Sequence, residues 1–344
     1  MLAISLYGML LAIFLDSALG QNATIALPLP TKTLVQLDTQ GTVFENLLVR
    51  QNGDIIITSL HPQPIAYLLK APWSSDPKLL FLHRFEEVDG LGGVVEIRPG
   101  TYVVAGTKWE GLAAPVANAT VVQEFALDEN DSVSSARIIA RVPEAGFLNG
   151  VVVAPGSANL VLGADSLQGV VWRIDLTTGD SEISIDVAEM KPLDPHGVLR
   201  AGVNGLKVRN GHLYWSNSNL AGVYRIKTDD NGYPAMGAAT EQVFRLCDAS
   251  GVDDFNFDHE GNIYITTHID NTLYRFGEDG STQLVAGALT DLGLAGDSAV
   301  AFGRTSFDEH VAYITTAGGI FSPINGTITE PAKIVSVDTS GIAQ

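Results

Sequence analysis

Acidic and amide side chains recur at one position of a repeated phrase in this sequence. Each copy consists of an Asn or an acid, an apolar run, a turn and a second apolar run. The clearest copies cover residues 44–58, 148–166, 202–219 and 252–268. Their opening residues are Glu45, Asn149, Asn204 and Asp253. Two carboxylates and two amides at one point would suit a hard cation such as Ca²⁺, which takes oxygen ligands. A purely structural role is the alternative, because Asn and Asp are also frequent turn residues.

The phrase recurs along the whole chain at steps of 44 to 56 residues when two weaker copies, anchored at Gly93 and Asp297, are included. A period of roughly 40–50 residues with several short strands per unit is typical of a β-propeller. The sequence therefore predicts an all-β fold in which residues 21–344 form a single six-bladed β-propeller. We expect a strand within 31–38 to pair with one within 332–341 and close the ring, because closure removes free sheet edges.

Three residues are candidates for catalysis: Asp253, Asp254 and His268. Asp254 directly follows Asp253, so in an extended backbone their side chains point to opposite faces. His268 ends an apolar strand and could act as a general acid or base at the rim of the channel. A hydrogen-bonded structural histidine is the competing interpretation.

Other residues are candidates for holding a substrate. The set is Asn149, Asn204, Ser298, Tyr214 and Phe255, of which Ser298 occupies the matching position of the last repeat. For the aromatic members, packing between blades is the alternative role.

Composition excludes several classes of function. The formal net charge is −19, from 20 basic and 39 acidic residues, which argues against nucleic acid and anionic membrane surfaces as partners. The sequence contains no nucleophile elbow, phosphate-binding loop or dinucleotide fingerprint. Cys247 is the only cysteine, so no disulfide can form within the chain.

Residues 1–20 are short, apolar and interrupted by Asp16, as is typical of a signal peptide. A membrane anchor is the alternative, and it would require about 18 uninterrupted apolar residues. We therefore expect the secretory route and no membrane anchor. Glycosylation sequons, which fit that route, occur at Asn22, Asn118, Asn130 and Asn325. The sequence does not indicate an oligomeric state.

The repeated phrases resemble the SMP-30/gluconolactonase superfamily over about residues 31–341, with paraoxonase and strictosidine-synthase-like propellers as more distant relatives. The motifs that carry the resemblance are FENLLVRQNG, FLNGVVV, GVNGLKV, VDDFNFDHEGN and SAVAFGRT…AYITTAGG. The resemblance implies a divalent-cation site at Glu45, Asn204 and Asp253, with Asn149 as a further ligand of metal or substrate. It also implies a functional histidine at His268.

The chain departs from the lactonase pattern at three places. Asn46 and Leu47 follow Glu45 where lactonases have Gly-Pro, Ser59 stands where an acid often ends the next strand, and Asp254 replaces a glycine. The phrases ENLxVRxNG and DDFxxD are instead similar to a fungal secreted branch, which includes hetero-Diels–Alderases of tropolone-sesquiterpenoid biosynthesis.

Three functions follow from the resemblance. The first is a cyclase that joins a tropolone quinone methide to an apolar terpene alkene in the central pocket, with small polyketide-terpenoid substrates and no required cofactor. The second is a Ca²⁺-dependent lactonase or esterase, in which the metal would polarise the carbonyl and activate water. The third is a propeller that binds a small molecule without catalysis.

Overall fold

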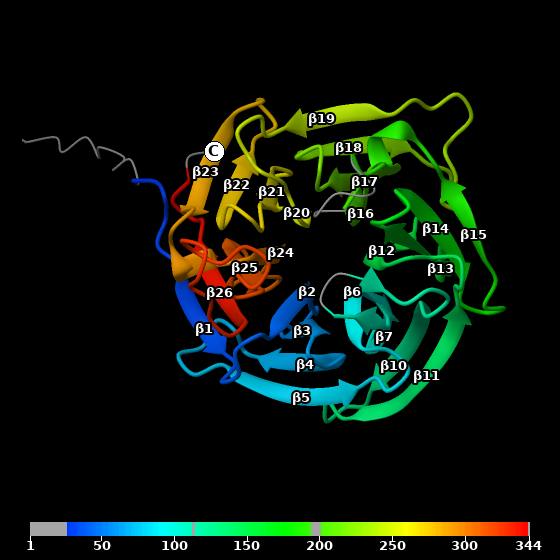
Figure 1. Cartoon of the computed structure of the whole chain (residues 1–344), viewed down its shortest axis with the longest axis horizontal. Helices are drawn as coiled ribbons and strands as arrows, with labels where there is room; N and C mark the ends of the chain where they lie inside the picture. Colours follow the sequence, from blue (N-terminus) through cyan, green and yellow to red (C-terminus); the bar gives the residue numbers. More distant parts are fainter. Residues whose placement is uncertain (1–25, 112–113, 194–200, 343–344) are drawn as a thin grey trace, which may run out of the picture.

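A computed structural model describes residues 26–111, 114–193 and 201–342. In these ranges six four-stranded antiparallel sheets are arranged as blades around a central axis (Figure 1). The helical elements of the described residues are two 3₁₀ turns, Ala188–Met190 and Leu292–Leu294. The predicted all-β, six-bladed propeller is confirmed.

Each blade runs from an inner strand at the axis to an outer strand at the rim. Blade 1 contains β2 (Val43–Val49), β3 (Ile55–His61), β4 (Ile65–Lys70) and β5 (Lys78–Arg84). Blade 2 contains β6 (Gly90–Arg98), β7 (Thr101–Thr107), β10 (Val121–Leu127) and β11 (Val133–Arg141). Blade 3 contains β12 (Leu148–Ala154), β13 (Ser157–Asp165), β14 (Val170–Asp175) and β15 (Ser181–Ile185).

The second half of the chain repeats this order. Blade 4 contains β16 (Val203–Arg209), β17 (His212–Asn217), β18 (Gly222–Lys227) and β19 (Glu241–Arg245). Blade 5 contains β20 (Phe255–Phe257), β21 (Ile263–Thr266), β22 (Thr272–Phe276) and β23 (Thr282–Gly287). Blade 6 contains β24 (Asp297–Phe302), β25 (Val311–Thr316), β26 (Lys333–Asp338) and β1 (Lys32–Gln36). A small hairpin of β8 (Trp109–Glu110) and β9 (Ala114–Pro115) lies between β7 and β10.

The two ends of the chain close the ring, as predicted. Strand β1 pairs antiparallel with β26, with Lys32 opposite Ser336 and Gln36 opposite Lys333. In Figure 1 the blue N-terminal strand therefore lies beside the red C-terminal one. This pairing covers the outer edge of β26, which would otherwise expose unpaired backbone groups.

The core is distributed around the ring, between the blades. Six apolar clusters of the described residues each join two adjacent blades. Between blades 3 and 4, for example, Leu162 packs in one cluster with the fully buried Trp215. Apolar side chains on both faces of each sheet are therefore buried, which explains why the strands read as nearly continuous hydrophobic runs.

A tight turn joins the inner strand β16 to the second strand β17 of blade 4. Asn210 and Gly211 have φ values of 51° and 72° in the two-residue turn between β16 and β17. Two consecutive left-handed residues match the type I′ hairpin, for which Asn-Gly is the preferred pair.

Candidate functional site

The inner strands carry β-bulges near their first residues. The register against the second strand shifts at this point in β2, β6, β12, β16 and β24. A bulge adds a residue and re-aims the neighbouring side chains, and bulges are common beside active sites. The residues at this level, one from each blade, are Glu45, Gly92, Asn149, Asn204, Asp253 and Ser298. We call this set the polar ring, and the end of the axis where it lies the upper end.

Backbone pairing fixes the membership of the polar ring. Leu47, Leu206 and Phe255 each lie two residues beyond a ring member and each pair with the second strand of their blade. In blades 2 and 6 the corresponding paired residues are Val94, opposite Val104, and Val300, opposite Ile314. The residues two positions before them, Gly92 and Ser298, are therefore the ring members of these blades. The anchor Gly93 therefore lies one residue beyond the ring position of blade 2. In blade 6 the ring position is Ser298, which the sequence also indicated, and the anchor Asp297 lies one residue before it. The bulge shifts the register, and neither weak copy has an Asn to mark the position.

The four polar members predicted from the sequence lie together. Each is at most 8% exposed. The pKa of Glu45 is raised well above its ordinary value, mainly because the side chain is buried. The negative charge of Asp253 raises this pKa further, whereas a hydrogen bond from Asn149 lowers it. Two carboxylates on blades 1 and 5 are thus close enough to repel each other.

His268 contacts the carboxylate of Asp253. Its Nδ1 atom lies 3.0 Å from Oδ2 of Asp253, within ion-pair distance but without the alignment of a hydrogen bond. Burial raises the pKa of Asp253 above its ordinary value, while contact with His268 and a hydrogen bond from Asn204 act in the opposite direction. The backbone of His268 has a φ of 57°, an uncommon conformation for a residue other than glycine. Such conformations cluster at functional sites.

Two buried oxygen atoms near the polar ring have no hydrogen-bond partner among the described residues. They are Oδ1 of Asn204 and Oδ1 of Asp297. Asp297 is fully buried, and the backbone N–H of Thr267 donates to its other oxygen at 3.3 Å. Burial raises the pKa of Asp297 well above its ordinary value. An unpaired buried acceptor costs free energy, so these atoms are available to a ligand.

Asp254 lies one layer below the polar ring, in a different environment from Asp253. Asn46 donates to its Oδ2 atom at 3.0 Å, and Lys207 forms an ion pair with its Oδ1 atom at 2.8 Å. Asn46 and Asp254 come from blades 1 and 5, which are not neighbours. We call the three residues Asn46, Lys207 and Asp254 the floor. Its existence could not be predicted from the sequence, since it depends on the closure of the ring.

The absence of a side chain at Gly205 makes room for the carboxylate of Asp254 in the floor. A Cβ atom on Gly205 would lie 1.9 Å from Oδ1 of Asp254, far inside contact distance. Gly205 follows the ring member Asn204, just as Asn46 follows Glu45. The small residue in blade 4 therefore makes room for the acid from blade 5.

The structure does not bring all predicted substrate-binding residues to the polar ring. Tyr214 and the fully buried Phe255 belong to the apolar cluster between blades 4 and 5. The hydroxyl of Tyr214 accepts a hydrogen bond from Arg225 at 3.0 Å. Ser298 belongs to the ring, but its hydroxyl donates to the backbone oxygen of Phe44 at 2.7 Å and ties blade 6 to blade 1.

An apolar cluster lies at the upper end of the axis. Its buried members are Val43, Leu60, Phe147 and Ala317, against which Trp109, Leu167 and Ile320 pack. Next to it in the chain, Phe321 lies 5.5 Å from His268, measured between ring centroids. We call this cluster together with Phe321 the apolar rim. None of these residues is among the site residues that the sequence predicts, because most of them belong to loops that share no motif.

Comparison with known proteins identifies the family. A protein of Sarocladium schorii, provisionally named hetero-Diels–Alderase asR5, is 30% identical over 360 residues, which cover 96% of this chain and 88% of that protein. A protein of a Phoma species, provisionally named hetero-Diels–Alderase, is 30% identical over 344 residues, which cover 93% of each chain. This chain belongs to the hetero-Diels–Alderase family. No model of a known protein family matches the sequence.

Solved structures place this hetero-Diels–Alderase family member in a wider fold group. A luciferin-regenerating enzyme has a TM-score of 0.62 at 13% identity, with 91% of this chain and 96% of that chain covered. Regucalcin from Agrobacterium tumefaciens, a calcium-binding protein, has a TM-score of 0.60 at 12% identity, with 90% and 95% covered. At these identities the likeness shows the fold alone. That fold is a six-bladed propeller, as the sequence predicted.

The polar ring contains the types of oxygen atom that bind a hard divalent cation. Glu45 and Asp253 supply carboxylates, Asn149 and Asn204 supply amides, and the partnerless Oδ1 of Asn204 is a suitable ligand atom. Within the described ranges, no group of three or more His, Cys, Asp and Glu side chains is arranged to hold a metal. A cation at the ring would therefore depend on its amide oxygens as well as its carboxylates.

Several predictions concern segments away from the ring. The signal-peptide segment 1–20 and the sequon at Asn22 lie outside the described residues. Asn118, Asn130 and Asn325 are exposed, so all three sequons are accessible, and glycosylation stays a prediction. No helix in the described ranges is both long and apolar enough to cross a membrane.

Proposed function

We propose that this protein catalyses an intermolecular hetero-Diels–Alder reaction between a tropolone quinone methide and an apolar cyclic terpene alkene. The observation that carries the proposal is the position of Glu45, Asp253 and His268 beneath the apolar rim, in a chain of this family. Apolar walls suit both reactants, and buried polar groups at the base of a pocket can orient them.

The ionisable groups suit the step that makes the quinone methide. Loss of water from a hydroxymethyl tropolone breaks the C–O bond, and it requires one proton for the departing hydroxyl and removal of one from the ring hydroxyl. Burial raises the pKa of Glu45 and so favours its protonated form, which could donate a proton to the leaving group. Asp253 with His268 accepts the other proton. The two transfers balance, and one water molecule leaves.

The cycloaddition itself requires little covalent chemistry from the protein. One C–C bond and one C–O bond form between heterodiene and alkene, and no atom is lost. The amide group of Asn149 is suited to donate a hydrogen bond to the heterodiene oxygen, because it has two N–H donors and one of them goes to Glu45. Holding two reactants in a near-attack pose can lower a barrier by up to about 7–11 kcal/mol.

The test is product formation by the purified protein. Hydroxymethyl tropolone and a cyclic sesquiterpene alkene would be incubated with the protein, with and without EDTA, and the adduct resolved by chiral chromatography and mass spectrometry. We expect one stereoisomer, formed well above the rate without protein and insensitive to EDTA. A racemic adduct at the rate of the protein-free control would contradict the proposal, and saturable binding without product would favour a binding protein.

The polar ring also supports a second candidate, a Ca²⁺-dependent lactonase or esterase. The specific observation in its favour is the ring of oxygen donors with the partnerless Oδ1 atom of Asn204. Glu45, Asn149, Asn204 and Asp253 would hold the cation, which would supply Lewis-acid polarisation of an ester carbonyl. Asp253 and His268 would then orient and deprotonate water. This candidate predicts hydrolysis of a lactone panel that EDTA abolishes and added Ca²⁺ restores.

A further inference from the structure

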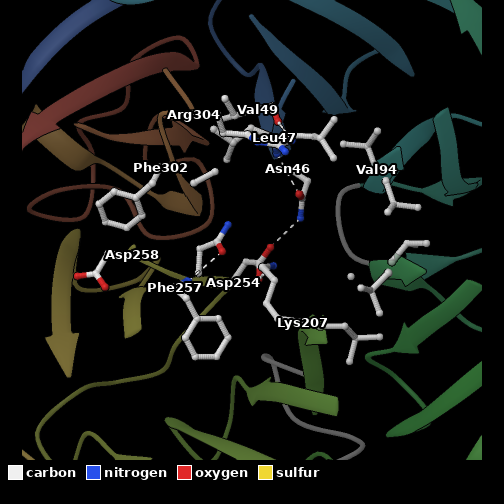
Figure 2. A pocket seen from close by; sticks show the side chains of 18 of the residues that line it. Asn46, Leu47, Val49, Val94, Lys207, Asp254, Phe257, Asp258, Phe302 and Arg304 are labelled. Carbon is white, nitrogen blue, oxygen red and sulfur yellow. Dashed lines mark hydrogen bonds and ion pairs between the residues drawn. The ribbon is translucent and has the colours of Figure 1, made fainter. Parts of the chain in front are cut away.

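A cavity lies on the other side of the floor from the polar ring. It has a volume of about 320 Å³, at the lower end of the range typical of small-molecule sites. All six blades supply apolar side chains to its wall. These include Leu47, Val94, Val151, Leu206, Phe257 and Phe302. Figure 2 shows the side chains arranged around one space, and in this view the bond between Asn46 and Asp254 crosses the middle of it. We call it the lower cavity.

The acids of the lower cavity already have partners. Asp254 accepts hydrogen bonds from Asn46 and from the backbone N–H of Phe255, and it pairs with Lys207. Asp258 accepts from both the backbone and the side-chain nitrogen of Asn262, at 2.8 and 2.7 Å. Neither carboxylate therefore demands a donor from a ligand.

The cations of the lower cavity keep donors to spare. The guanidinium of Arg304 has five N–H donors, and in the described structure one of its nitrogens donates, to the backbone oxygen of Val49 at 3.2 Å. The ammonium of Lys207 has three donors, and its hydrogen bond among the described residues goes to Asp254. The N–H groups of Arg304 and Lys207 that have no partner here are hydrogen-bond donors. They are positively charged groups in a chain whose net charge is −19.

We propose that the lower cavity is a second binding site, separate from the polar ring, for an organic carboxylate with a hydrocarbon body. The hydrocarbon body would lie against the ring of Val, Leu and Phe side chains, where apolar contact is favourable. The carboxylate would accept hydrogen bonds from Arg304 at the open edge, because a guanidinium fits a carboxylate with two parallel bonds. This proposal does not depend on the reaction at the polar ring.

The experiment is calorimetric titration of the full chain with octanoate, and with octanol as the neutral counterpart. We expect one octanoate per chain and binding of octanol at least about fivefold weaker, from the lost charged hydrogen bonds. Equal affinity for the two ligands, or no octanoate binding, would overturn the proposal.

Variants locate the binding. Arg304→Gln, at an exposed side chain, should weaken octanoate about fivefold, whereas Arg84→Gln, an exposed arginine in β5, should not. Val152→Phe should fill the lower cavity and abolish binding, and its melting temperature shows whether it has folded. Asp253→Asn should leave octanoate affinity unchanged. Loss of binding in Asp253→Asn, with binding kept in folded Val152→Phe, would place octanoate at the polar ring and overturn the proposal.

Discussion

The buried carboxylates in and beside the polar ring differ in how many of their oxygen atoms have a partner. Glu45 and Asp253 are compensated in part by Asn149, Asn204 and His268, while Asp297 one residue before the ring has a buried oxygen without a partner. Burial of acids that stay incompletely paired reduces stability, and natural proteins keep such arrangements where function needs them.

Asp297 makes the stability of the protein depend on pH. Because its pKa is raised in the folded state, the folded protein keeps a proton that the unfolded chain releases above about pH 3.8. This contribution to stability is present at low pH and is lost as pH rises through the folded-state pKa. Asp297→Asn, which does not titrate, should therefore be more stable than the wild type at pH 8 by about 1–3 kcal/mol and nearly equal to it at pH 4.

Urea unfolding of both proteins at the two pH values measures this difference. Asp38→Asn, at an exposed carboxyl, serves as the matched control and should shift neither value. The account would be contradicted if Asp297→Asn were less stable than the wild type at pH 8. That result would mean that the folded protein stabilises the charged carboxylate of Asp297.

At the scale of the element, the inner strand with its bulge is the unit that builds the site. The sequence placed Glu45, Asn149, Asn204 and Asp253 at one level of the propeller because these residues share a phrase with the bulge. In blade 2 it placed the anchor one residue away, at Gly93, because Gly92 is not the Asn or acid that marks the position elsewhere. In blade 6 it named both Asp297 and Ser298, of which Ser298 is the ring position. It could not distinguish aromatic packing from pocket lining, so Tyr214 and Phe255 were assigned to a substrate site although they lie between blades.

The close approach of blades 4 and 5 requires a glycine at position 205. In Gly205→Ala the new Cβ would overlap Oδ1 and Cγ of Asp254, at 1.9 and 2.7 Å. The buried acid is held by Lys207 and Asn46 and cannot move freely, so we expect a loss of about 1–3 kcal/mol. Thermal melting checks this. Gly163→Ala, whose Cβ would meet only the Leu148 side chain at 3.3 Å, should cost less, and an equal loss in both variants would argue against a special role for position 205.

At the scale of the whole molecule, the blade repeat was predictable because the phrase recurs at steps of 44 to 56 residues. The ring closure was predictable because a strand-like run lies near each end of the repeats, at 31–38 and 332–341. The floor and the lower cavity were not, because they arise from contacts between residues as far apart in the sequence as Asn46 and Asp254. The polar ring and the lower cavity thus lie on opposite sides of a bond that only the closed ring can form.

Closure by β1 should contribute measurably to stability. A chain that begins at Asp38 would lack β1 and expose the edge of β26, together with apolar surface that Leu34 and Val35 cover. Compared with a chain that begins at Ala26, we expect a loss of about 3 kcal/mol or more in urea unfolding, and a tendency to aggregate. Identical unfolding curves and identical elution by size exclusion would show that the ring closes without this strand.

The central claim is that the polar ring at the upper end carries the reaction. The most direct test is the rate of adduct formation by Asp253→Asn relative to the wild type, with Val152→Phe in the lower cavity as the comparison. General acid–base catalysis is worth about 10²–10⁴ in rate, so we predict a loss of at least about 10² in Asp253→Asn and little change in Val152→Phe. Wild-type rate in a folded Asp253→Asn protein would contradict the account.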